Sequence, residues 1–202
     1  MTELPCVVIT SREAKKQASH FIEVNSKRIK LNNLNQYRAA VVAGESSAVS
    51  LSGILAKAAV SIPLNPMGNK DCPPRTTQAI GTLLRMLESY SEKQMVWALT
   101  VIPDAYGDKR GVMRASLLKA MAEWIKRNPD TSRSVMIATL QGIDLDELER
   151  DARAYRAVDG KRTPEAFMMV IERKYNAAKR AAPTERAAAH LGEAPAPSRR
   201  GA

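Results

Sequence analysis

The sequence has very little of what most active sites are built from. Its 202 residues include only two cysteines, Cys6 and Cys72, and two histidines, His20 and His190. The cysteines are too few and too far apart for a metal cluster or a disulfide framework. There is no His-x-x-x-His pair, no phosphate-binding glycine loop and no nucleophile-elbow motif. We therefore expect no metal and no cofactor, and we predict that the chain is not an enzyme.

Aromatic residues and long apolar runs are also scarce. Aromatics make up 4% of the chain, so a core must be built from Ala, Leu, Ile, Val and the nine Met. No stretch reaches the ~18 apolar residues of a membrane span, and the N-terminus lacks the pattern of a signal peptide. We expect no membrane partner and a cytoplasmic location. Hydrophobic residues still make up 45% of the chain, which is enough for a packed core.

Hydrophobic spacing predicts a mainly α fold. The β-branched run at residues 6–9 indicates one short N-terminal strand. Helices follow at about 11–25, after an N-cap at Thr10 or Ser11, and at about 33–43 and 47–55. Residues 59–64 alternate like a short edge strand, and 65–74 have the composition of turns. From residue 76 onward, apolar stripes predict a bundle of about five helices. The last begins at Thr163–Pro164 and ends near residue 181.

These patterns divide the chain into four predicted parts. Residues 1–60 form a first unit of one strand and three helices, and 61–75 form a linker. Residues 76–182 form the helical bundle, and the Ala-, Pro- and Arg-rich residues 183–202 form a disordered tail.

The net charge of +10 is concentrated in two clusters. The first lies within and after the first predicted helix, and the second lies along the last one. Such clusters are typical of proteins that neutralise the phosphates of DNA. A basic face that only keeps the protein soluble is the alternative interpretation. The residues that we expect to bind DNA are Arg12, Lys15, Lys16, Asn25, Lys27, Arg28, Lys30 and Arg38 in the first cluster, and Arg173, Lys174, Lys179 and Arg180 in the second.

Residues 4–52 contain three motifs in a fixed order. A Pro-x-x-Val strand at 5–9 precedes an F-x-x-x-N-x-x-R string at 21–28, and a helix finishes in Ala-Gly-Glu at 43–45. This pattern resembles the second half of a ParB/sulfiredoxin-like domain of the D-G-Q-H-R type. A Tyr175–Asn176 pair followed by basic residues is similar to the tails of some relatives. The resemblance implies that Asn25 and Arg28 lie near a ligand groove; a helix-capping Asn and a solvent-exposed Arg are the alternative.

The D-G-Q-H-R segment itself would precede residue 4 and is missing from this sequence. The resemblance therefore implies a non-catalytic piece of such a domain. The leading hypothesis is a DNA-associated accessory protein of a plasmid, phage or other mobile element that binds DNA without sequence preference. The alternative is a protein-interaction module that docks onto a chain carrying the missing segment.

Overall fold

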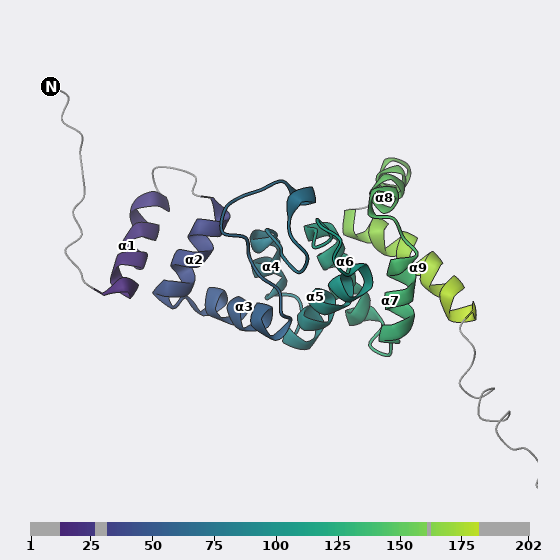
Figure 1. Ribbon diagram of the computed structural model, residues 1–202, viewed down its shortest axis with the longest axis horizontal. Coiled ribbons are helices and arrows are strands. Elements are labelled where there is room, and N and C mark those ends of the chain that lie inside the picture. Colours follow the sequence, from purple (N-terminus) through teal and green to yellow (C-terminus); the bar gives the residue numbers. More distant parts are fainter. Residues whose placement is uncertain (1–12, 27–31, 161–162, 182–202) are drawn as a thin grey trace, which may run out of the picture.

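The computed structural model describes residues 13–26, 32–160 and 163–181, and all structural statements below concern these residues. They form an elongated stack of helices that runs from α1 at one end to the last turns of α9 at the other (Figure 1). The elements are α1 (Ala14–Ser26), α2 (Asn33–Ala43), α3 (Ser46–Lys57), the 3₁₀ helix η1 (Asn69–Asp71), α4 (Ile80–Met86), α5 (Glu92–Tyr106), α6 (Ala115–Arg127), α7 (Arg133–Gln141), α8 (Leu145–Asp159) and α9 (Thr163–Ala181).

The mainly α-helical prediction is confirmed for the described residues, and many helix ends lie where capping chemistry places them. Ser91 and Gln94 form a reciprocal capping box at the start of α5. Asp144 accepts hydrogen bonds from two backbone N–H groups at the start of α8. Gly44, with φ of 77°, ends α2 in the left-handed conformation that glycine adopts without strain.

One hydrophobic core joins the helices from Leu34 in α2 to Tyr175 in α9. α5 and α6 lie at its centre, and their inward faces are fully buried at Met95, Leu99 and Leu117. α9 packs against α6, α7 and α8, whereas α1 packs against α2 at the far end. The apolar face of α1 is less buried than its hydrophobic spacing predicts, since Phe21 keeps 41% of its surface exposed.

The segment between α3 and α4 is irregular, as its turn-rich composition predicts. The predicted edge strand at 59–64 is wrong in the described structure, where Ser61 forms an isolated parallel bridge with Thr76. Pro63 lacks the N–H needed to extend such a ladder. The division into units 1–60, 61–75 and 76–182 stays a prediction.

Two further predictions concern residues that the structure does not describe. The strand at 6–9 and the disordered tail at 183–202 both lie outside the described ranges. Among the described residues no single helix is long and apolar enough to cross a membrane, although α2 and α3, which meet at a bend of 102°, pass that test when taken together.

Candidate nucleic-acid interface

Half of the first predicted cluster lies outside the described structure. Arg12, Lys27, Arg28 and Lys30 fall in the ranges 1–12 and 27–31, so their roles stay predictions. Asn25 lies in the last turn of α1. The remaining members are Lys15, Lys16 and Arg38.

Two of these three cations have partners within the chain. Lys16 pairs with Glu13 at 3.2 Å. The guanidinium of Arg38 donates hydrogen bonds to the carbonyl oxygens of Pro63 and Leu64. The end of the Lys15 side chain lies 3.6 Å from the position of a Cβ on Gly44, next to the C-terminus of α2, where a positive charge is favourable. Lys16 and Arg38 are thus engaged by their own chain, whereas Lys15 has this favourable position but no ion pair or side-chain hydrogen bond with the described residues.

The second predicted cluster is different. Arg173, Lys179 and Arg180 are exposed, and Lys174 is half-buried. None of these four makes an ion pair or a side-chain hydrogen bond with the described residues, in contrast to most cations elsewhere. The last nine residues of α9 contain these four basic residues and no acidic one, whereas residues 32–160 carry 16 basic and 14 acidic side chains. The excess charge of the described structure is therefore densest at the end of α9.

The structure does not bring the two predicted clusters together. α1 and the last turns of α9 lie at opposite ends of the long axis (Figure 1). The clusters are two separate surfaces, and four of their five described cations without an ion pair or side-chain hydrogen bond lie on the α9 surface.

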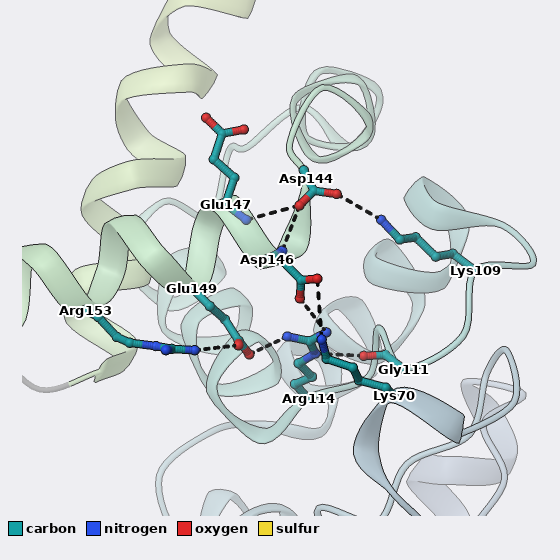
Figure 2. Close-up of polar contacts among 9 residues, drawn as sticks. All are labelled: Lys70, Lys109, Gly111, Arg114, Asp144, Asp146, Glu147, Glu149 and Arg153. Atoms are coloured by element: carbon teal, nitrogen blue, oxygen red, sulfur yellow. Dashed lines mark hydrogen bonds and ion pairs between the residues drawn. The ribbon is translucent and has the colours of Figure 1, made fainter.

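Three depressions lie along the seam between α6 and α9. The largest, about 600 Å³, is bordered by Arg85, Lys119 and the first residues of α9. Arg114 and Glu149 line it too, but they bind each other. The Arg114 guanidinium lies 2.5 Å from Glu149 and 3.4 Å from Asp146, and its Nε donates to the carbonyl of Gly111 (Figure 2).

The charges around Arg114 form a closed network. Asp146 also contacts Lys70, and Asp144 contacts Lys109 (Figure 2). Burial alone would lower the pKa of Arg114, but its hydrogen bonds to Glu149 and Asp146 raise the pKa above the ordinary value. These groups join the starts of α6 and α8 to η1 and to the loop at 107–114. They bind one another, so they are not available to a ligand.

A second depression, of about 250 Å³, is also lined by groups that bind one another. The Tyr90 hydroxyl donates to Glu123 at 2.8 Å, and Arg127 donates to the other oxygen of that carboxylate at 2.6 Å. The ammonium of Lys126 lies over the Tyr90 ring. Burial and then the Glu123 contact raise the pKa of Tyr90 to about 12. This cluster ties the start of α5 to α6.

The third depression, of about 320 Å³, lies beside the basic end of α9, and we call it the α9 pocket. Its walls include Trp124 and Thr131, whose side chains bind each other. Five further side chains line it without an ion pair or hydrogen bond to the described residues: Asp130, Glu172, Tyr175, Asn176 and Lys179. The α9 pocket thus has polar groups available for a guest, and one of them belongs to the buried Tyr175.

Sequence reasoning missed most of the α9 pocket. Tyr175 and Asn176 stand out in the sequence only through the family resemblance, and Asp130 carries no signal because it follows a helix end in an ordinary turn. The packing of α6 against α9 brings residues 127–131 and 172–179 together, and no local pattern predicts that juxtaposition.

No metal site is found among residues 13–26, 32–160 and 163–181, since no group of three His, Cys, Asp or Glu side chains there is placed to hold an ion. Comparison with known proteins adds no family: no protein-family model, no curated protein and no solved structure matches the chain. The resemblance to a ParB/sulfiredoxin-like domain therefore stays a prediction.

Proposed function

We propose that the protein is DNA-associated and binds the phosphate backbone, without sequence preference, through the last turns of α9. The observation that supports this proposal is the set of four cations, Arg173, Lys174, Lys179 and Arg180, that lack acidic partners in the described structure. Side chains that are not held by an internal carboxylate can displace counterions from DNA.

The spacing of these cations suits a groove of duplex DNA. They form two pairs about 9 Å apart along the helix axis, since a helix rises about 1.5 Å per residue. Small residues, Asn176, Ala177 and Ala178, lie between the pairs. The major groove admits an α-helix, and Arg173 and Arg180, seven residues apart, lie on the same side of α9, so both can contact phosphates at the groove edge. Nothing in this arrangement reads a base sequence.

The test is a salt titration of binding to a labelled blunt duplex, with wild type and the variant in which all four cations are replaced by alanine. Four neutralised phosphates correspond to a slope of about −3.6 in log K against log salt. We expect the variant to lose about three units of that slope. The matched control replaces four other exposed cations, Lys93, Lys119, Arg150 and Arg156, which changes the net charge equally. Equal losses in both variants would reject the proposal.

A second candidate function rests on the other end of the molecule. Three exposed large hydrophobic residues lie on α1–α3: Phe21, Val42 and Val49, which keep 41%, 53% and 47% of their surface. Exposed apolar side chains on neighbouring helices favour a protein-interaction role for this end. Wild-type affinity for DNA in the α9 variant, together with capture of a partner that is lost in Val42→Asp, would favour this alternative.

A further inference from the structure

The α9 pocket contains a hydroxyl group, that of Tyr175, on a side chain that is almost fully buried. Tyr175 is only 7% exposed, and its ring packs edge-on against Trp124 with ring centroids 5.1 Å apart. The Tyr175 hydroxyl has no hydrogen-bond partner among the described residues. Every fully enclosed side-chain N or O atom there does have a partner, so this hydroxyl must be open to solvent. The α9 pocket is the solvent-filled space that Tyr175 borders.

The remaining groups give the pocket two chemically distinct sides. Lys179, Asn176 and the Tyr175 hydroxyl can donate hydrogen bonds, and Lys179 adds a positive charge. Asp130 and Glu172 offer carboxyl oxygens as acceptors, on side chains without partners in the described structure. A simple phosphate would be repelled by the two carboxylates, and a simple cation by Lys179. The pocket suits a guest that carries an anionic group and N–H donors together.

An unpaired nucleotide has that combination. Its phosphate is anionic, and the Watson–Crick edge of guanine presents adjacent N–H donors beside a carbonyl acceptor. Unpaired bases are commonly recognised through hydrogen bonds on that edge. The volume of about 320 Å³ lies at the lower end of the range of about 300–1,000 Å³ for small-molecule pockets.

We propose that the α9 pocket receives one unpaired guanine nucleotide of the bound DNA. Asp130 and Glu172 accept hydrogen bonds from the base, while Lys179 contacts its phosphate. The Tyr175 hydroxyl and Asn176 bind the remaining polar atoms of the guest. This inference rests on the proposed function, because the cations on the last turns of α9 bring the DNA to the mouth of the pocket.

The test compares three labelled DNAs with the same duplex: blunt, with a two-guanine overhang and with a two-thymine overhang. The two overhangs add the same number of phosphates, so electrostatics alone predicts equal affinities for them. A good bidentate contact discriminates between bases by roughly 5- to 150-fold, and we expect about 10-fold tighter binding of the guanine overhang.

The variants Asp130→Asn and Glu172→Gln separate base recognition from charge. Each removes one negative charge and so raises the net charge by one, and non-specific attraction then predicts slightly tighter binding of all three DNAs. The proposed contact predicts instead that the preference for the guanine overhang over the thymine overhang falls at least 5-fold, while binding of the blunt duplex does not weaken. Tyr175→Phe keeps the packing on Trp124 and should lower the preference about 3-fold through loss of the hydroxyl. Asp108→Asn, an exposed carboxylate far from the pocket in sequence, is the matched control and should leave the preference intact.

The outcomes distinguish the two proposals. Equal affinity for the guanine and thymine overhangs, or a preference that survives in both carboxylate variants, overturns the pocket assignment. If the blunt duplex still binds with a salt slope that depends on α9, the proposed function stands without the pocket. If the blunt duplex is not bound but the guanine overhang is bound in a carboxylate-dependent way, the pocket stands and the backbone proposal falls.

Discussion

The network around Arg114 and the last turns of α9 are built from the same kinds of side chain and have opposite properties. Arg114 is 12% exposed on its side chain and contacts two carboxylates and a carbonyl. Arg173 and Lys179 are exposed and have no such partner in the described structure. Charge density along the sequence is therefore a poor guide to ligand binding, because a cation that is paired with groups of its own chain is less available to bind a ligand.

The comparison also separates stability from recognition. Arg114, the most buried group of the network, is costly to remove, since its loss leaves the partly buried Glu149 without its closest partner. Groups at the end of α9 can be removed at little cost to the fold because they satisfy nothing inside it. Four predictions follow this division, and each can contradict it.

Arg114→Met should have the largest effect. Removing the guanidinium leaves Glu149 without its closest partner. We expect a loss of about 2–3 kcal/mol in the free energy of unfolding, less than the ~3–5 kcal/mol of a fully buried pair because Glu149 keeps 26% of its side-chain surface. Urea denaturation at pH 7 measures this loss. Lys70→Ala, which removes a 75% exposed partner, is the control and should change stability by less than about 1 kcal/mol.

Gly111→Ala should come next. Gly111 has φ of 69°, and an added Cβ would lie 2.7 Å from the carbonyl oxygen of Asn69. Because backbone atoms surround the site, they must shift, and the carbonyl that accepts from Arg114 shifts with them. We expect a loss of about 2 kcal/mol. Gly160→Ala has a similar φ and no atom within 4 Å, so it should cost about 1 kcal/mol in the same thermal or urea assay.

Tyr90→Phe should cost about 1 kcal/mol at pH 7, because Glu123 loses a hydrogen bond. Burial tends to raise the pKa of Glu123, but the contacts with Tyr90 and Arg127 outweigh it and lower the pKa below its ordinary value. A depressed carboxylate pKa stabilises the fold above the unfolded-state pKa and loses this effect as pH falls through the folded-state value. The stability difference between wild type and Tyr90→Phe should therefore shrink below about pH 4. A difference independent of pH would reject this account.

Arg173→Ala with Lys179→Ala should have the smallest effect on stability. We expect a change within about 0.5 kcal/mol, because both side chains are exposed and alanine is a strong helix former. Thermal denaturation measures it. A loss of several kcal/mol would mean that these cations support the fold and would remove the contrast with Arg114.

Much of the helical layout was predictable from the sequence. The ends of α2 and α5 at Gly44 and Gly107 and the start of α8 after Asp144 follow from local capping and turn chemistry. The irregular structure at 59–64 was not predictable, because a strand needs a neighbouring strand to pair with. In the described residues Ser61 pairs only with Thr76, in an isolated bridge. Alternation along the chain carries no information about whether that neighbour exists.

The candidate site was predictable only in part. The basic end of α9 is visible in the sequence as a run without acidic residues. The hydrogen bonds of Arg38 to carbonyls 25 and 26 residues away were not predictable, nor was the position of Asp130 in the same pocket wall as residues of α9. Both depend on long-range packing, which sets whether a charged side chain is free or engaged.

The most direct test compares the two ends of the molecule in one salt titration on a blunt duplex. Lys15→Ala/Lys16→Ala and Arg173→Ala/Lys179→Ala remove the same charge from α1 and from α9. The account predicts that the α9 pair makes the slope of log K against log salt shallower by about two units, and that the α1 pair changes it by less than about half a unit. A larger loss from the α1 pair than from the α9 pair would contradict it.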